Sequence, residues 1–364
     1  MDTQNAALRR LSSRIVEARN SKTALEIRGG GTKSFYGNPP RGEPLHVTSL
    51  SGIGSYEPTE LVVTAFGGTP LAELEAALAE RGQCLPFEPP HFGTSGTVGG
   101  MVAAGLAGPG RPGAGPVRDY VLGATLLNGM GEALTFGGQV MKNVAGYDVS
   151  RVLAGSMGIL GVICEVSLKV MPVLPACRTL QFEFTEDAAL LQLNRWVCEG
   201  LPITASSWHR DLLCVRLGGA AATVAHSRIR MGGQEVEPPD AVRWWSDVRD
   251  HRHEFFAFTG MEFARGECLW RLAAPDTAPP IALSGERFIE WAGAQRWYRT
   301  ADSAVRIRAL ASAAGGHATL VRAADKSAGA FTLPAEASMQ IHRRLKQSLD
   351  PSRIFNPGRL YPDL

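Results

Sequence analysis

Residues 28–34 read R-G-G-G-T-K-S and directly follow a short apolar run at residues 24–27 that is typical of a β-strand. Three successive glycines let the backbone turn tightly and approach a ligand closely. Successive backbone N–H groups in such a turn form a nest that suits an anion such as a pyrophosphate. The spacing is neither that of G-x-G-x-x-G nor that of a P-loop. Taken alone, the stretch is better explained by a glycine-rich turn that binds nothing.

A second region rich in glycine and proline spans residues 86–116 and is expected to be a long loop. It contains P-F-E-P-P at 86–90 and T-V-G-G at 97–100. Loops of this length in a compact protein are usually functional. The segment carries almost no charge and includes several large apolar side chains, so it is expected to be buried rather than a flexible linker. Its small residues allow the chain to run flat along a planar or extended ligand.

The third region combines K-N-V-A-G-Y-D at 142–148 with G-S-M-G-I-L-G-V-I at 155–163. Ser156 and the neighbouring glycines are able to present backbone donors to the polar edge of an aromatic ring system. Residues 158–170 alternate in polarity and predict a long strand.

In this order, the three regions resemble the FAD-binding domain of the vanillyl-alcohol-oxidase and para-cresol-methylhydroxylase (PCMH) type. The segment D-P-S-R-I-F-N-P-G-R-L at 350–360 is similar to the closing segment of that family. The resemblance covers residues 24–175 and this tail. It implies a set of FAD-binding residues that consists of Gly29, Gly30, Gly31, Thr32 and Lys33 at the pyrophosphate, Gly99, Gly100 and Gly105 at the adenine and diphosphate side, Gly155, Gly158, Gly161, Val162 and Ile163 at the ribityl chain and isoalloxazine, and, from the matching motifs, Pro86 and Asn356.

Two departures from the family pattern refine this expectation. Covalent members carry a histidine or cysteine at set positions, whereas the first loop here has Thr32, so we expect non-covalent FAD; His91 is the only imidazole near these motifs. Catalytic relatives have a histidine-rich metal site with the pattern H-x-G-D-G-N-x-H. The corresponding residues 311–323 contain one histidine and no acid, which predicts no metal site and puts independent substrate oxidation in doubt.

The expected fold class is α+β, with a PCMH-type FAD-binding domain at residues 1–175, a cap domain at 176–330 and a C-terminal segment at 331–364 that returns to the FAD-binding domain. The cap is predicted to be ferredoxin-like, because residues 179–236 show the order β-α-β-β-α-β. FAD is expected between the two domains, where small-molecule sites are common.

Within the family, the chain is most similar to FAD-binding subunits of bacterial glycolate oxidase complexes. This implies a part in the oxidation of glycolate to glyoxylate, with hydride transfer to flavin and onward electron transfer. The resemblance also implies a catalytic FAD subunit as a partner and a small 2-hydroxy acid as substrate. None of the six cysteines forms a C-x-x-C pair, so an iron–sulfur partner subunit is expected to carry electrons onward. Two alternatives remain open: a stand-alone FAD-dependent 2-hydroxy-acid dehydrogenase of the D-lactate type, and a non-catalytic scaffold.

Few residues suggest catalysis directly. His317 is a candidate general base, although it equally suits a turn cap or a core hydrogen bond. Arg271 and Arg322 are candidates for a bidentate carboxylate clamp, or for surface and interface ion pairs. The Trp244–Trp245 pair suits either a docking patch or the core of the cap.

Charge and hydropathy patterning limit the partners and the location. The chain has 364 residues, and 37 Lys and Arg against 35 Asp and Glu give a net charge of +2, which argues against a nucleic-acid partner. No apolar segment of the kind found in signal peptides follows the first charges. The longest uncharged stretch, 89–110, is interrupted by prolines and glycines, so no transmembrane segment is expected. The chain is therefore expected in the cytoplasm, with any membrane association made through partners.

Overall fold

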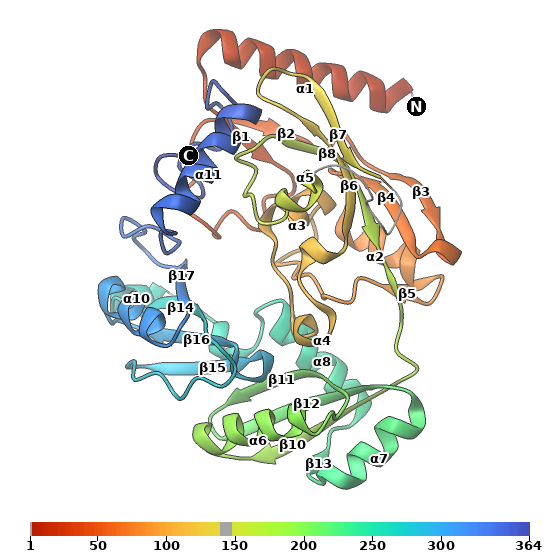
Figure 1. Cartoon of the computed structure of the whole chain (residues 1–364), viewed down its shortest axis with the longest axis vertical. Coiled ribbons are helices and arrows are strands. Elements are labelled where there is room, and N and C mark those ends of the chain that lie inside the picture. Colours follow the sequence, from red (N-terminus) through yellow and green to blue (C-terminus); the bar gives the residue numbers. More distant parts are fainter. Residues whose placement is uncertain (1, 139–147, 259) are drawn as a thin grey trace.

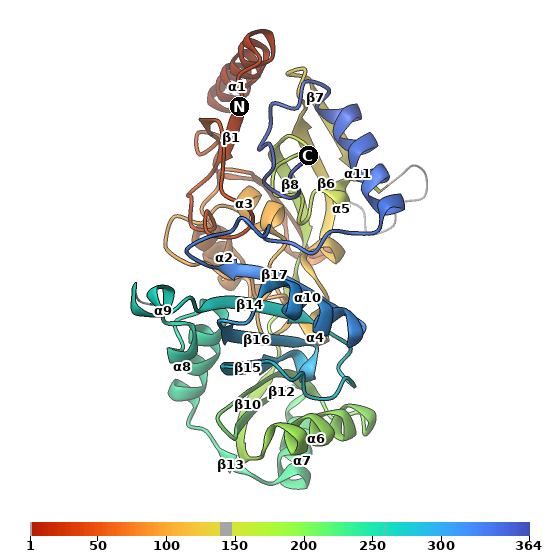
Figure 2. The same ribbon diagram turned by 90° about the vertical axis from the view of Figure 1, so that its left-hand side faces the viewer.

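The structure is a computed structural model that describes residues 2–138, 148–258 and 260–364. Residues 142–147 of the third motif lie outside the described residues. The strands form one five-stranded sheet, one eight-stranded sheet and two short pairs. Figures 1 and 2 show the two large sheets one above the other, with the C-terminal helix packed beside the first.

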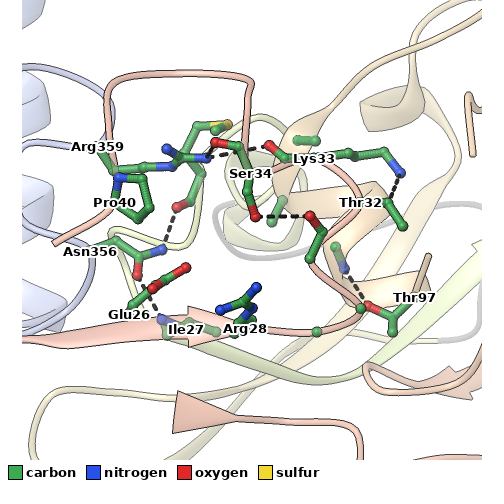
Figure 3. A pocket seen from close by; sticks show the side chains of 17 residues that line it. Glu26, Ile27, Arg28, Thr32, Lys33, Ser34, Pro40, Thr97, Asn356 and Arg359 are labelled. Atoms are coloured by element: carbon green, nitrogen blue, oxygen red, sulfur yellow. Dashed lines mark hydrogen bonds between the residues drawn. The ribbon is translucent and has the colours of Figure 1, made fainter. Parts of the chain in front are cut away.

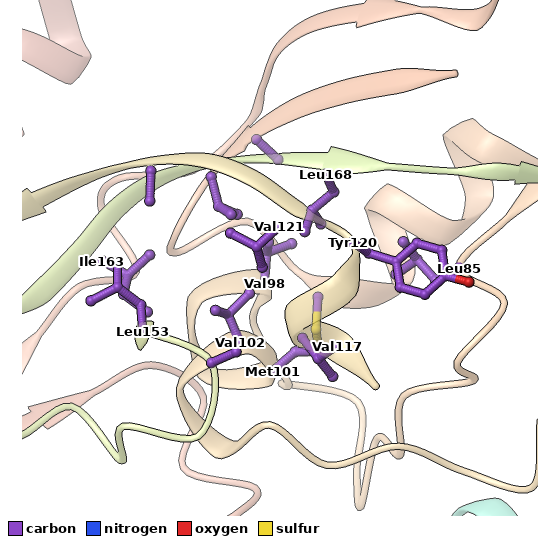
Figure 4. Close-up of a cluster of buried hydrophobic side chains, with 14 of the residues drawn as sticks. Leu85, Val98, Met101, Val102, Val117, Tyr120, Val121, Leu153, Ile163 and Leu168 are labelled. Atoms are coloured by element: carbon purple, nitrogen blue, oxygen red, sulfur yellow. The ribbon is translucent and has the colours of Figure 1, made fainter. Parts of the chain in front are cut away.

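The N-terminal unit, residues 2–172 with 336–364, is built around the five-stranded antiparallel sheet. Its strands in spatial order are β3 (Ile53–Glu57), β4 (Val62–Phe66), β8 (Val162–Lys169), β6 (Val121–Leu127) and β7 (Ala133–Gly137). Successive side chains of a strand point to opposite faces, and both faces here are covered. Helices α2 (Leu71–Ala79), α3 (Val98–Ala104) and α11 (Glu336–Leu349) pack on one face, where Val98 and Met101 meet Val121 and Leu168 (Figure 4).

The opposite face of this sheet is covered by α1 (Asp2–Ser21) and by the parallel pair β1 (Leu25–Arg28) and β2 (Glu43–His46). Leu11 and Ile15 of α1 are buried against Leu127 and Cys164 of the sheet. The remaining short elements of the unit are η1 (Pro58–Glu60), β5 (Gln83–Cys84) paired with β9 (Met171–Pro172), α4 (Arg111–Ala114), η2 (Val117–Asp119) and α5 (Val149–Val152).

The cap, residues 176–322, begins with the predicted order β-α-β-β-α-β. These elements are β10 (Ala176–Glu183), α6 (Glu186–Cys198), β11 (Ile203–His209), β12 (Leu212–Gly219), α7 (Ala221–Met231) and β13 (Gln234–Glu235). Their order in space, β13-β10-β12-β11, places the first and third strands in the centre, so the ferredoxin-like prediction is confirmed.

The cap sheet then continues beyond this unit, which the sequence reading did not anticipate. Four more antiparallel strands extend it at the edge of β11: β15 (Glu286–Glu290), β16 (Gln295–Thr300), β14 (Cys268–Ala273) and β17 (His317–Arg322). Helices α6, α7 and α10 (Ala304–Ala313) cover one face. The other face contacts α8 (Pro238–Arg249), η3 (Glu254–Phe256) and the N-terminal unit, while α9 (Gly260–Ala264) and η4 (Trp291–Gly293) lie in connections.

Two local expectations were wrong. Residues 86–116 are not one long loop, because they include α3 and α4. Thr97 caps α3 by accepting a hydrogen bond from the Gly100 N–H, and Met101 and Val102 bury the apolar side of this helix despite its two glycines. The predicted strand at 158–170 begins only at Val162, because residues 158–161 form a turn.

The C-terminal tail is tied into the N-terminal unit by a buried ion pair. The Lys346 Nζ atom lies 2.8 Å from the Asp350 carboxylate, and both side chains are 0 % exposed. The same ammonium donates to the carbonyls of Ile159 at 2.7 Å and Phe355 at 2.8 Å. The tail then pairs with β1, since the Leu25 N–H donates to the Ile354 carbonyl.

The aromatic residues of the second half form the junction between the two units. Phe255, Phe256 and Trp297 of the cap pack with Tyr36 and Met157 in one buried cluster. Trp245 is also buried and Trp244 is half-buried, so this region is core rather than an exposed docking patch. Within the described residues, no helix is both long enough and apolar enough to cross a membrane.

Candidate functional site

The glycine loop that follows β1 lines a cleft on the N-terminal unit, with the tail on its far side (Figure 3). The cleft is also bounded by Thr97 and Gly100 at the start of α3, by Met157, and by Asn356 and Arg359 of the tail. Three segments that are far apart in the sequence therefore meet at one cleft.

The loop offers unused hydrogen-bond donors to this cleft. None of the backbone N–H groups of residues 30–33 donates a hydrogen bond to another described residue. Since backbone donors are normally satisfied by protein or by solvent, four successive free N–H groups suit a multiply charged oxyanion. This donor set fits a diphosphate.

Steric contacts show a second reason for the glycines. A Cβ atom on Gly30 would lie 1.4 Å from the Ser95 carbonyl oxygen, and one on Gly29 would lie 2.4 Å from Thr97 Oγ1. The segment 95–97 therefore crosses directly over the loop. Gly31 differs, because its φ of +71° lies in the left-handed region that favours glycine.

A second cavity continues the cleft and shares Ile27, Gly29, Gly100 and Asn356 with it. The predicted residues that line this continuation are Gly99, Gly158, Gly161, Val162 and Ile163. With residues 29–33, the structure thus brings together most of the predicted cofactor-binding set along one connected surface.

Three predicted residues lie elsewhere. Gly105 ends α3 and packs on Gly155, whose N and Cα atoms would each lie 2.8 Å from an added Cβ. The Gly155 N–H donates to the Val102 carbonyl, so it is not free for a ligand. The Pro86 carbonyl lies against Gly110, away from the cleft.

Asn356 joins the two walls of the cleft. Its Oδ1 accepts from the Ile27 N–H at 2.7 Å, and its Nδ2 donates to the Met157 carbonyl at 2.7 Å. Arg359 was missed in the sequence reading, although it stands in the G-R-L of the closing segment. It lines the cleft and donates to the carbonyls of Ser34 and Asn38.

The Lys33 side chain lines the cleft, and its protonation depends on its surroundings. Burial lowers the pKa of Lys33 to about 8, while Asp250 and Glu75 act in the opposite direction. Its Nζ lies 3.5 Å from the His91 carbonyl. A bound anion would favour the charged form.

A further cavity lies at the junction of the two units. Its lining includes Phe35, Tyr36 and Phe92 of the N-terminal unit, and His251, Arg271 and Trp297 from the cap. The Arg271 guanidinium donates to the Tyr36 hydroxyl at 2.9 Å. Burial, and then the charges of Arg322 and Arg271, lower the pKa of His251 to about 3, so its ring is neutral near pH 7.

Glu290 is the acid on the lining of this junction cavity. Burial raises its pKa to about 7, even though Trp297 and Gln295 both donate to its carboxylate.

His317, the candidate general base, lies away from these cavities. His317 is exposed at the start of β17, where it pairs with Ala273 of β14. The described residues contain no group of three or more His, Cys, Asp or Glu side chains placed to hold a metal ion. The role of His317 as a base stays a prediction.

The fold and the free donors of the cleft define an FAD-linked oxidoreductase class. Residues 8–137 match the family model of an FAD-binding domain. The structure resembles alkyldihydroxyacetonephosphate synthase with a TM-score of 0.65 at 16 % identity, over 95 % of this chain and 74 % of that one, which supports the fold.

The sequence relatives identify the family more closely. The chain is 44 % identical over 354 residues to glycolate oxidase subunit GlcE of Escherichia coli (strain K12), which covers 97 % of both proteins. It is 30 % identical over 155 residues to glycolate oxidase subunit GlcD of Bacillus subtilis (strain 168), which covers 42 % of this chain and 33 % of that protein. The chain belongs to the GlcE family of FAD-binding flavoproteins.

Proposed function

We propose that this chain is the FAD-binding subunit of a glycolate oxidase complex and takes part in the oxidation of glycolate to glyoxylate. The observation that carries the proposal is the row of free N–H groups at residues 30–33, on a chain that matches the GlcE protein over nearly its whole length. A diphosphate would satisfy these donors without a lysine cluster.

The cleft residues have distinct roles in this proposal. The N–H groups of the glycine loop hold the diphosphate, Lys33 balances its charge, and Asn356 keeps β1 and the turn at Met157 at a fixed separation. When bound, FAD supplies the hydride-accepting ring, and the protein supplies its position and electrostatic environment.

We propose that FAD is held non-covalently. Thr32 stands in the loop where covalent members carry histidine. The ring of His91 lies beside α2, with its Nε2 atom 2.8 Å from the Glu75 carboxylate.

The partners are proposed to be a catalytic FAD subunit and an iron–sulfur subunit. The six cysteines, at positions 84, 164, 177, 198, 214 and 268, are all free thiols, and burial raises the pKa of Cys164 and Cys214 to about 12. Thiols of this kind are poor cluster ligands, since the thiolate binds metal. Onward electron transfer would then need a cluster in a partner. The proposal places the chain in the cytoplasm, or at the inner face of the membrane through these partners, with domains at residues 1–175, 176–330 and 331–364.

The visible spectrum of the purified chain tests the proposal. Flavin absorbance that is released to the supernatant after denaturation and precipitation is the expected result. Colour that stays in the pellet would mean a covalent bond. A chain that remains colourless after FAD is added would refute the proposal and favour a scaffold.

Substrate added without oxygen then separates two functions. The junction cavity, which Arg271 lines, favours a second candidate, a dehydrogenase that oxidises the 2-hydroxy acid itself. Bleaching of the isolated chain by glycolate or D-lactate would support that candidate. An unchanged spectrum would support a relay that receives electrons within the complex.

A further inference from the structure

A cavity of about 440 Å³ lies between helix α8 and the sheet of the cap, and is called the α8 cavity below. Its lining comes from β10, β12 and α8, with Glu88 contributed by the N-terminal unit. Among the described residues that line it, Arg249 alone also lines the junction cavity, and none lines the cofactor cleft. Small-molecule sites typically have volumes of about 300–1,000 Å³, so the α8 cavity has room for a ligand of its own.

One wall of the α8 cavity is apolar and includes Ala241, Val242 and Trp245 of α8. The Trp245 ring is held in place, because its indole N–H donates to Thr179 Oγ1 at 2.9 Å and the Arg216 guanidinium lies 5.3 Å from its centre. Val242 is 71 % exposed although its side chain is large and apolar. Open apolar surface beside a cavity suits the apolar part of a ligand.

The other side chains of the lining offer hydrogen-bond donors. Arg178, Arg216 and Arg249 line the cavity together with one carboxylate, that of Glu88. Each guanidinium keeps one terminal nitrogen without a partner among the described residues: Nη2 of Arg178, Nη1 of Arg216 and Nη1 of Arg249. Both Glu88 oxygens are engaged, Oε1 by Arg216 and Oε2 by the Gly110 N–H, each at 2.7 Å. The groups left for a ligand are therefore cationic donors, which favour an anion.

The acids beyond the lining do not fully neutralise these arginines. Each of two acids is shared between one arginine of the lining and one beyond it: Glu235 between Arg178 and Arg228, and Asp250 between Arg249 and Arg252. A shared carboxylate leaves each guanidinium with part of its charge, and a bound carboxylate would complete the pairing.

A buried hydroxyl adds a further donor to the α8 cavity. Thr179 lines the cavity and is 2 % exposed. Its Oγ1 accepts from Trp245, but its own O–H donates to no acceptor among the described residues. A buried donor without an acceptor is unfavourable, and a ligand oxygen would supply the missing acceptor.

We propose that the α8 cavity binds a small aromatic monocarboxylate, with the ring against Trp245 and Val242 and the carboxylate at the free guanidinium nitrogens and the Thr179 hydroxyl. An aromatic ring matches the fixed indole, because offset stacking adds to the burial of apolar surface. A single negative charge matches arginines that are already partly neutralised. The proposal does not rest on the proposed function, because the α8 cavity is separate from the cofactor cleft.

Titration calorimetry on the purified, FAD-containing chain tests the proposal, with 2-naphthoate as the probe. We expect 2-naphthoate to bind about 10-fold or more tightly than 2-naphthamide, which keeps the rings and loses the charge. Arg178→Gln should weaken 2-naphthoate binding by about 5- to 10-fold, because it removes a charged donor. Arg243→Gln is the matched control, since Arg243 is an exposed arginine of α8 that does not line the cavity, and it should bind like the wild type.

A charge at the rim gives a second test that leaves the buried groups intact. Val242→Glu should weaken 2-naphthoate binding by about fivefold, because the new carboxylate repels the ligand. Val305→Glu is its control, at an equally exposed apolar position on α10. Two exposed thiols report the place of binding: 2-naphthoate should slow the alkylation of Cys177, which lines the cavity, and leave that of Cys198 on α6 unchanged.

Several results would overturn the α8 site. These are a wild-type chain that does not bind 2-naphthoate, equal binding of the amide, and unchanged binding by both Arg178→Gln and Val242→Glu. Binding that FAD abolishes without protection of Cys177 would place the ligand in the cofactor cleft instead. A wild-type dimer that Val242→Glu dissociates would mean that a second copy fills the cavity.

Flavin absorbance near 450 nm is recorded for every sample, so that this proposal and the proposed function fail separately. A chain with full FAD that does not bind 2-naphthoate would overturn the α8 site and leave the flavoprotein function intact. A chain that takes up no FAD but binds 2-naphthoate with Cys177 protected would support the α8 site and refute the proposed function.

Discussion

Replacing Lys346 by methionine tests how far the C-terminal tail holds the cofactor cleft together. The ammonium makes three contacts between 2.7 and 2.8 Å, to Asp350 and to the carbonyls of Ile159 and Phe355. Methionine retains most of the apolar stem, so the substitution removes donors and a charge without opening a large cavity.

The magnitude follows from what the substitution leaves behind. Loss of one partner of a buried ion pair costs about 3–5 kcal/mol. Asp350 keeps two backbone donors, the N–H groups of Phe355 at 2.8 Å and Ile354 at 3.2 Å, so we expect the lower end, about 3 kcal/mol. Such a loss makes detachment of the tail about 100-fold more frequent.

Hydrogen exchange and flavin retention measure this effect. Exchange at Leu25 and Asn356 should accelerate, because their N–H groups bond across the contact between β1 and the tail. FAD affinity should fall, because Asn356 detaches with the tail. Gln347→Met is the matched control, an exposed position on the same helix. Adding Asp350→Asn to Lys346→Met should restore part of the stability. A Lys346→Met protein within about 1 kcal/mol of wild type would refute this account of the tail.

The cleft yields three more predictions. FAD affinity should decrease as pH rises above 8, by up to tenfold per pH unit, because Lys33 without ligand loses its proton near pH 8 and a bound diphosphate favours the charged form. Calorimetry on the wild type and on Lys33→Met checks this, and a wild-type affinity that does not depend on pH would contradict it. Asn356→Asp puts an acceptor against the Met157 carbonyl and should weaken FAD binding about 10-fold or more in a flavin-fluorescence titration, whereas an unchanged affinity would remove Asn356 from the site. Gly31→Ala should lower both FAD affinity and the melting temperature, because φ is +71° there, while Gly138→Ala, with open space around it, should change neither; equal effects of the two would be evidence against the loop geometry.

The order of elements in the cap could be predicted from local patterns, and the size of its sheet could not. The pattern β-α-β-β-α-β is encoded within about sixty residues of continuous chain and leads to one favoured pairing. The extension depends on β11 pairing with β15, where Trp208 lies opposite Ile289. No local sequence pattern predicts this pairing, because the two residues are far apart in the sequence. Each strand taken alone is also compatible with a position at the edge of a sheet.

Glycine content explains both a success and an error in the N-terminal unit. The loop at 28–34 was predicted to bind an anion because three glycines after a strand let the backbone approach a ligand closely. The same residue type concealed α3, since Gly99 and Gly100 are poor helix formers. The structure shows why the helix nevertheless contains Gly99: a Cβ there would lie 2.8 Å from the Gly67 carbonyl. Packing between segments overrides local propensity at this position.

The polar groups of the junction cavity were largely beyond sequence reasoning. The sequence does not single out His251 as a cavity residue, because its surroundings are typical of a helix. In the structure α8 ends at Arg249, and His251 adopts a φ of +54°, which turns its ring among Phe256, Trp297 and Phe92. The sequence after a helix does not show that a non-glycine residue there adopts a left-handed backbone conformation.

The continuity of one short segment argues against a pure scaffold. Residues 30–33 offer free N–H groups to the cleft, and Phe35 and Tyr36, which follow Ser34, contact Arg322 and Arg271 of the cap. The Lys326 ammonium also donates to the Phe35 carbonyl, so this segment is held from the connection that follows the cap as well. A scaffold needs only the packing, which apolar side chains would provide without free backbone donors. The free donors are understood if an anion binds in the cleft.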